Sequence, residues 1–207
     1  MQKERREKTE QKILKAALSL FVRKGYNGTS IDEITKAAEL TKGALYGHFE
    51  SKAHVVLRLI DEFKARFIKE MIDSVEQENL NAPGKLHRII SFNARLALEN
   101  QSLCVLPTFL TFELKEHEKF EITLKQLYTE YRVYVSRIIK QGQKEGYFKK
   151  DLDPDLAALA FISLHDGTLH QWFLNQNLLE GKDFVKTFRN IFFGGIQNKQ
   201  SDTSNPE

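Results

Sequence analysis

The sequence predicts an all-α protein in which a small N-terminal helical unit precedes a larger helical body. Apolar residues recur at steps of three and four along most of the 207 residues, and the sustained alternation of a half-buried strand is hard to find. Serine, threonine, aspartate, proline and glycine separate the periodic stretches at spacings typical of helix starts and ends. The pattern predicts about nine helices, three at the N-terminus followed by six longer ones.

The first three predicted helices lie in the first quarter of the chain. An apolar stripe over residues 13–21 predicts the first helix, which ends near Lys24 because a glycine follows. Ser30, with a glutamate three residues on, has the spacing of a capping box and starts a second helix that ends near Ala38. Thr41 then caps a third, short helix.

Six further helices form the predicted body. Ser51 caps the first of them, which runs to about Met71, and Asp153 caps another that has a proline at its first position. The other four are predicted at about residues 84–100, 107–117, 120–145 and 183–193. We therefore expect an N-terminal domain, residues 1–52, a larger helical domain, residues 53–196, and a disordered polar tail, residues 197–207.

Composition limits the location and the chemistry of the protein. The longest apolar run, residues 156–162, is far shorter than the ~18 residues that a membrane span needs, and the first residues contain no apolar signal region. Cys104 is the one cysteine, which rules out an internal disulfide and a cysteine-built metal site, and we interpret it as a core residue. We expect a cytoplasmic protein without a membrane partner, a metal or a cofactor.

Positive charge is concentrated at the N-terminus. Residues 1–52 contain 11 of the 31 lysines and arginines and 7 of the 28 acidic residues, so they carry a net charge of +4, whereas the rest of the chain carries −1. This polarity is expected if the N-terminal domain meets a polyanion. A solvated charged helix face is the alternative.

The stretch TKGALYGHFESK, residues 41–52, breaks the local rules that the rest of the sequence follows. Lys42 and Lys52 each come directly after a cap, where the helix dipole favours acidic side chains. Gly43 costs ~0.5–1 kcal/mol relative to alanine within a helix, and Gly47 weakens the same short helix again. Such exceptions in a well-patterned sequence mark a candidate functional site.

A nucleic-acid partner accounts for these exceptions. Lysines and free N–H groups at a helix start bind phosphate, and glycine allows the backbone to approach a duplex closely. Leu45 and Phe49, four residues apart, can anchor the inner side of the third helix, which leaves its polar and small side chains outward. Two short helices joined by a tight turn form the helix-turn-helix arrangement, whose second helix enters the major groove.

Residues 13–56 resemble the N-terminal domain of the TetR family of bacterial transcriptional regulators. The resemblance rests on an apolar first helix, a G-Y-x-x-T-S turn, a second helix and K-G-x-L-Y-x-H-F-x-x-K over about forty residues. The segment DLDPDLAALAFISLHDGTLHQWF is also similar to the penultimate helix of many members. The resemblance implies a ligand-responsive regulator, by default a repressor, that binds a pseudo-palindromic operator as a homodimer and is released by a small, largely apolar or aromatic effector; activation stays open.

The resemblance also implies which residues meet operator DNA. They are Thr29, Thr41, Lys42, Gly43, Ala44, Tyr46, His48 and Lys52. By their chemistry Thr41 and Ala44 suit base edges, whereas Tyr46, His48, Lys52 and the amides of Lys42 and Gly43 suit phosphates. The alternative to DNA contact is a packing or capping role for His48 and a role as a partly buried support for Tyr46.

Two residues depart from the family pattern. Glu39 stands where many members have glycine, so a left-handed backbone there costs ~1 kcal/mol unless the turn differs. Gly47 stands where an aromatic residue often adds a DNA contact. Both departures leave a second interpretation open, a helical protein-interaction module that has lost DNA binding.

The last two predicted helices have more apolar residues than one core can bury. We therefore expect them to form a four-helix dimer interface, with a role as central core helices as the alternative. The predicted interface residues are Phe161, Ile162, Leu169, Phe173, Phe184, Phe188, Ile191 and Phe192.

The resemblance implies an effector cavity in the helical body. Its candidate residues are Phe63, Phe67, Phe92, Phe109, Phe112, Glu113, Tyr128, His165, Asp166 and Trp172, each with an ordinary core, surface or interhelix role as its alternative. Catalysis is the rival function, with His165–Asp166 as an acid–base pair or Cys104 as a nucleophile. No phosphate loop, nucleophile elbow or paired-metal spacing supports it, and adjacent helical residues point about 100° apart, so we expect no catalytic residues.

Overall fold

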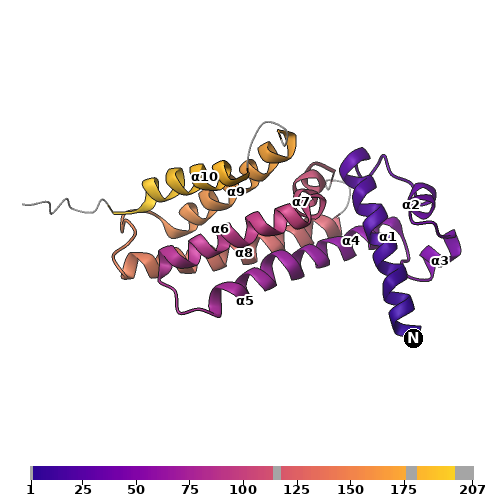
Figure 1. The fold of residues 1–207 in the computed structure, drawn as a ribbon, viewed down its shortest axis with the longest axis horizontal. Coiled ribbons are helices and arrows are strands. Elements are labelled where there is room, and N and C mark those ends of the chain that lie inside the picture. Colours follow the sequence, from indigo (N-terminus) through magenta and orange to yellow (C-terminus); the bar gives the residue numbers. More distant parts are fainter. Residues whose placement is uncertain (1, 114–117, 176–180, 199–207) are drawn as a thin grey trace, which may run out of the picture. The chain divides into compact units, whose positions relative to one another are not determined.

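The computed structural model describes residues 2–113, 118–175 and 181–198 of the chain. Within these ranges helices are joined by short turns, no strand is formed, and the all-α prediction is confirmed (Figure 1). Counting residues 52–76 as one continuous helix, the described residues form nine helices. No helix in the described ranges is both long enough and apolar enough to cross a membrane.

The first three helices begin and end close to where their caps predict. They are α1 (Gln2–Lys24), α2 (Ile31–Ala37) and α3 (Lys42–Tyr46). The capping box before α2 is complete, because the Ser30 hydroxyl accepts from the Glu33 amide and the Glu33 carboxylate accepts from the Ser30 amide. α1 is longer than its apolar stripe, since the exposed, charged residues that precede Ile13 are good helix formers and continue the helix.

The fourth predicted helix contains a wide turn that the sequence does not indicate. It consists of α4 (Lys52–Phe63), a π-helical stretch (Lys64–Lys69) and α5 (Glu70–Glu76), which follow one another without a break. The Phe63 and Phe67 rings stack at this point with centroids 4.6 Å apart. A π-helical turn contains about one residue more than an α-helical turn. Apolar residues four positions apart, such as Phe63 and Phe67, therefore stay on one face through it, and the sequence pattern gives no sign of the change.

The remaining helices differ from the prediction at two prolines. They are α6 (Ala82–Glu99), α7 (Gln101–Glu113), α8 (Glu118–Lys144), α9 (Pro154–Leu174) and α10 (Gly181–Ile196). Pro83 lies within the first turn of α6, where its missing N–H has no helical partner to lose. Pro107 lies inside α7, so the predicted start of that helix is wrong; burial of Leu103 and Leu110 on either side outweighs the local cost of the proline. The predicted end at residue 117 lies outside the described residues.

The chain forms two compact units. Unit 1 contains the described residues within 1–71 and 95–129, and unit 2 contains those within 72–94 and 130–207. In unit 1, α1 packs on α2, α4 and α7. The first three helices therefore share a compact unit with α4 and α7, which extends beyond residue 52. The core of this unit includes the fully buried Ile13, Leu14, Phe21, Ile34, Leu45, Phe49, Leu59 and Ile60.

In unit 2, α9 and α10 run side by side (Figure 1). The Phe161 ring meets those of Phe188 and Phe192 edge-on, with centroids 5.4 and 5.0 Å apart. The C-terminal end of α10 is fastened to the loop after α8, because Lys149 donates its amide to Ile196 and Asn198 donates its amide to Tyr147. Residues 197 and 198 of the predicted tail thus take part in the fold, and the rest of that tail lies outside the described residues.

Glu39 adopts the left-handed conformation that its position requires. Its φ is +56°, and among the described residues it is the only residue other than glycine with a positive φ. The Glu39 and Leu40 amides donate to the carbonyls of Lys36 and Thr35, respectively, which is the hydrogen-bond pattern of a Schellman motif closing α2. The turn therefore keeps the geometry that favours glycine, and glutamate occupies it at a cost of ~1 kcal/mol.

Replacing Glu39 by glycine is expected to raise the free energy of unfolding by about 1 kcal/mol, because glycine removes the steric conflict at positive φ. Urea unfolding followed by far-UV circular dichroism measures the change. Glu39→Ala is the control, since alanine keeps the Cβ atom and should bring no comparable gain. Equal stabilities of the glycine and alanine variants would contradict this explanation.

Candidate nucleic-acid interface

α3 has a buried side and an exposed side, as its sequence indicates. Leu45 and Phe49 are buried in the core of unit 1, whereas the side chain of Tyr46 is 54% exposed. The Thr41 hydroxyl accepts a hydrogen bond of 3.1 Å from the Ala44 amide and so closes the start of the helix. The helix is thus held from beneath by two apolar anchors and presents its other side outward.

The fold has no steric need for Gly43 in this helix or for Gly47, which caps its C-terminal end. A Cβ atom at Gly43 would meet only the Thr41 hydroxyl, at 3.9 Å, and one at Gly47 would make ordinary contacts of 3.5 Å with two carbonyl oxygens. Gly47 also has an ordinary helical φ of −69°. Neither the space around these residues nor the backbone conformation of Gly47 therefore requires glycine, and Gly43 lowers the intrinsic stability of α3.

Lys52 is held by the turn between α1 and α2. Its ammonium donates to the carbonyl oxygens of Tyr26 (2.7 Å) and Thr29 (2.8 Å) and lies 4.1 Å from the centre of the Tyr26 ring. Thr29 is only 2% exposed, and its hydroxyl donates to the carbonyl of Gly25. Both side chains thus make contacts within this chain, at the turn between α1 and α2.

Acidic side chains in the first turn of α2 pair with two lysines of neighbouring helices. The Lys42 ammonium lies 2.6 Å from Asp32, and the Lys24 ammonium lies 2.5 Å from Glu33. The hydrogen bond from Lys24, together with those from Ser30, lowers the pKa of Glu33 to about 2, and the hydrogen bond to Asp32 raises the pKa of Lys42. Sequence reasoning missed both pairs, because it does not show which residues of different helices face each other.

His48 is half-buried and packs next to Phe49, with ring centroids 6.3 Å apart. Its Nδ1 atom is buried without a hydrogen-bond partner. This placement agrees with the packing alternative for the residue and leaves Lys42 and Tyr46 as the two large exposed side chains of α3.

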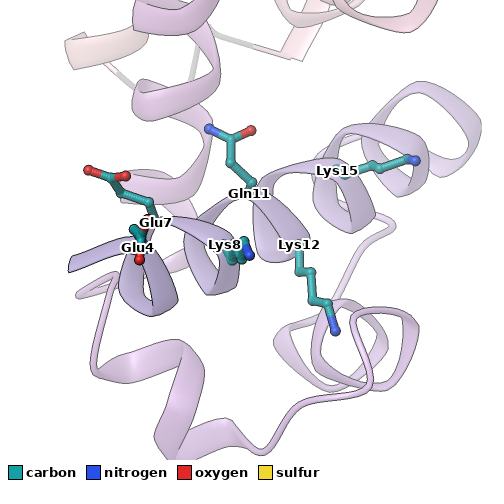
Figure 2. A pocket seen from close by; sticks show the side chains of 6 residues that line it. All are labelled: Glu4, Glu7, Lys8, Gln11, Lys12 and Lys15. Atoms are coloured by element: carbon teal, nitrogen blue, oxygen red, sulfur yellow. The ribbon is translucent and has the colours of Figure 1, made fainter. Parts of the chain in front are cut away.

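α1 borders an open hollow of about 550 Å³ on the surface of unit 1 (Figure 2). The side chains around it all come from α1: Glu4, Glu7, Lys8, Gln11, Lys12 and Lys15. They carry charges of both signs and include no aromatic residue. This hollow contains none of the predicted effector residues.

Both halves of the chain match families of known regulators. Residues 13–59 match the model of bacterial regulatory proteins of the tetR family, and residues 79–202 match the tetracyclin repressor-like C-terminal domain. The chain belongs to the TetR family. The MbdR regulator from Azoarcus sp. CIB is 30% identical, with a TM-score of 0.83 over 90% of this chain and 98% of its own.

More distant relatives of this TetR-family chain are also regulators. The repressor DhaR of Mycobacterium sp. (strain GP1) is 23% identical over 94% of this chain and 96% of its own length. The fatty acid metabolism regulator protein of Bacillus subtilis (strain 168) is 24% identical over 90% and 95%. The crystal structure of FadR from Bacillus subtilis in complex with stearoyl-CoA shares the fold, with a TM-score of 0.73 over 90% of this chain and 98% of that one at 23% identity.

The predicted effector residues of this TetR-family chain fall in both compact units. Unit 1 contains the buried Phe63 and Phe67 and the half-buried Phe109 and Tyr128. Unit 2 contains the buried Phe92 and the half-buried His165, Asp166 and Trp172. Phe112 and Glu113 belong to α7, and their side chains lie outside the described part of the structure.

Of two features that bear on catalysis, the pair of His165 and Asp166 has a different geometry from the one expected, whereas Cys104 is a core residue as predicted. His165 Nδ1 and Asp166 Oδ1 are 3.3 Å apart, so the expectation that these neighbours do not converge is wrong; rotation about their side-chain bonds closes the gap that the helix geometry leaves. Cys104 is buried, which raises its thiol pKa to about 12, so the reactive thiolate is suppressed.

A buried polar pair in unit 2 was not among the predicted residues. Asn93, on α6, is 2% exposed and donates from Nδ2 to the Tyr131 hydroxyl on α8 at 3.2 Å. The Asn93 Oδ1 atom is buried without a hydrogen-bond partner. Burial raises the pKa of Tyr131, and the negative charge of Asp166 on α9 raises it further. The one available signal was an asparagine inside an otherwise apolar stripe.

The predicted dimer residues separate into buried and exposed groups. Phe161, Phe188 and Phe192 pack on one another inside unit 2, and Ile162 is also buried, whereas Ile191 is 61% exposed. Leu169 and Phe173 are half-buried, and the side chain of Phe184 lies outside the described part. The exposed apolar side chains of these two helices include Leu156, Leu159 and Ile191.

Lys52→Met is expected to lower the free energy of unfolding by about 1.5–3 kcal/mol, because it removes two charge-assisted hydrogen bonds, to the carbonyl oxygens of Tyr26 and Thr29. Chemical denaturation measures the loss. Lys42→Met is the matched control, since the Lys42 ion pair is solvent-exposed and its removal should change stability little. Similar small effects of both substitutions would show that Lys52 does not hold the turn.

Proposed function

We propose that this TetR-family chain is a ligand-responsive repressor that binds a pseudo-palindromic operator as a homodimer and releases it when a small effector binds. The observation that carries the DNA-binding part is α3 itself. It is anchored by Leu45 and by Phe49 just after its end, exposes Lys42 and Tyr46, and contains Gly43, which the fold does not need. A helix of this kind is suited to the major groove, where a close backbone approach compensates for its low intrinsic stability.

The DNA contacts divide by position on α3 in this proposal. Tyr46 and Lys42 contact phosphates, and Ala44 and Thr41 face base edges, Ala44 through a thymine methyl. The Thr41 hydroxyl already accepts from the Ala44 amide, so its remaining lone pair and its proton are the groups available to a base. Lys52 and Thr29 act indirectly by fixing the turn on which α3 rests.

The effector in this proposal is largely apolar and carries one polar group. The apolar lining would come from residues such as Phe92 and Trp172 of unit 2, and the polar group would meet Asn93 Oδ1, a buried acceptor without a partner. Leaving a buried acceptor unsatisfied costs about 1–3 kcal/mol, which a ligand donor would recover. FadR from Bacillus subtilis, whose structure contains stearoyl-CoA, supports an effector of this general character.

In this proposal the effector releases operator DNA by shifting the populations of two arrangements of the dimer. The effector lowers operator affinity only if it binds the DNA-incompetent arrangement of the dimer better than the competent one. A coupling free energy of about 1–3 kcal/mol reduces the affinity about 5- to 150-fold.

The dimer in this proposal forms through the outer faces of α9 and α10. Leu156, Leu159 and Ile191 are large apolar side chains left exposed on these helices. The buried phenylalanines Phe161, Phe188 and Phe192 support that surface from within their own chain. Two copies related by a twofold axis would bury the exposed side chains and place two α3 helices for successive half-sites.

Gly43→Ala is expected to weaken duplex DNA binding while raising the free energy of unfolding by about 0.5–1 kcal/mol, because the added methyl group suits the helix but occupies the space that the duplex backbone approaches. Fluorescence anisotropy with a generic duplex, across a range of salt concentrations, measures binding. For the wild type we expect a steep loss of affinity as salt increases. A flat salt dependence would instead favour a protein-interaction module.

Ile191→Glu is expected to convert the dimer into a monomer, because it places a charge in an apolar twofold contact. Sedimentation velocity measures the mass. Leu98→Glu is the control, since Leu98 is also an exposed apolar residue but lies on α6. Retention of the dimer by the Ile191 variant would exclude this face of α10 from the interface.

A further inference from the structure

Asp32 and Lys42 form an ion pair on the side of the helix-turn-helix that α3 exposes. Asp32 lies in the first turn of α2 and Lys42 in the first turn of α3, with a separation of 2.6 Å between the ammonium and a carboxylate oxygen. Their side chains are 67% and 60% exposed, so the pair is open to solvent and to an approaching partner. The Lys42 ammonium, which we assign to DNA phosphate, is therefore already paired with a carboxylate of its own chain in this structure.

We propose that Asp32 sets the DNA affinity of this protein by competing with DNA phosphate for Lys42. The proposal rests on the proposed DNA-binding function and adds a residue that opposes it. Binding of a phosphate to Lys42 requires the ammonium to leave or share the Asp32 carboxylate, and it brings a second anion close to that carboxylate. Both effects weaken the complex relative to one in which Lys42 is unopposed.

Competition of this kind has a signature in the salt dependence of binding. A lysine that neutralises a phosphate releases condensed counterions and contributes about 0.9 to the slope of log affinity against log salt. A lysine that is already neutralised by a carboxylate contributes less. Because an exposed ion pair is weak, phosphate can break it, and the expected effect of the pair on affinity is about two- to fivefold.

Asp32 also has a plain structural role that must be separated from this one. An acidic side chain in the first turn of α2 interacts favourably with the helix dipole. That role affects the stability of α2 but not the number of counterions released on DNA binding. The salt slope therefore distinguishes the two roles, whereas a melting temperature alone does not.

The experiment compares Asp32→Asn, Lys42→Met and the double variant with the wild type, using the full chain and a generic duplex over a series of salt concentrations. Asp32→Asn is expected to bind about two- to fivefold more tightly than the wild type near ~0.1 M salt, with a steeper salt slope. Lys42→Met is expected to bind more weakly. In the Lys42→Met background, Asp32→Asn should lose most of its effect, because the competition no longer exists.

Glu39→Gln serves as the matched control. It removes one negative charge from the same helix-turn-helix, and no ion pair of Glu39 is seen within the described residues. Equal gains in DNA affinity from Glu39→Gln and Asp32→Asn would show that only net charge matters and would overturn the proposal. An Asp32→Asn variant that binds DNA no better than the wild type would also overturn it. A wild type that binds no duplex even at low salt would overturn the proposed function itself, a result distinct from either of these.

Discussion

The position of α3 depends on the hydrogen bonds that Lys52 donates to the turn after α1. Its ammonium, at the first residue of α4, joins two carbonyl oxygens that belong to Tyr26 and Thr29, more than twenty positions earlier in the chain. α2 and α3 lie between these two points in sequence, so one cation fastens both ends of the segment that contains them. Leu45 and Phe49 then fix α3 from below. A short helix that contains one glycine and ends at another keeps a defined position because of these contacts and not through its own stability.

The elements with strong local signals were predictable from the sequence. Ser30 and Asp153 start helices where expected because each side chain satisfies free amides of the first turn, an interaction within a few residues. Glu39 has the left-handed backbone that the family pattern suggested for its position. The start of α7 was wrong because Pro107 has a strong local preference that burial on both sides of it overrides. Local chemistry is visible in a sequence, whereas the packing that outweighs it is not.

The candidate site was predictable in its location but less so in the roles of its residues. The segment from Thr41 to Lys52 was identified because it breaks helix rules, yet two of the residues assigned to DNA there, Lys52 and His48, lie against other parts of unit 1. Asp32 was missed because a charge count does not show which residues pair. Lys24 and Lys42 are each paired with an acidic side chain that the net charge of residues 1–52 already includes, so the sum gives no sign of either pair.

The burial of Cys104 has a practical consequence. The chain contains no other cysteine, and the thiolate form of this one is disfavoured by its apolar surroundings. A thiol introduced at an exposed position, such as that of Tyr46, would therefore be the group that a maleimide dye or a spin label modifies, with the native residue left in place. A label at that position reports on α3 without any alteration of the core that surrounds Cys104.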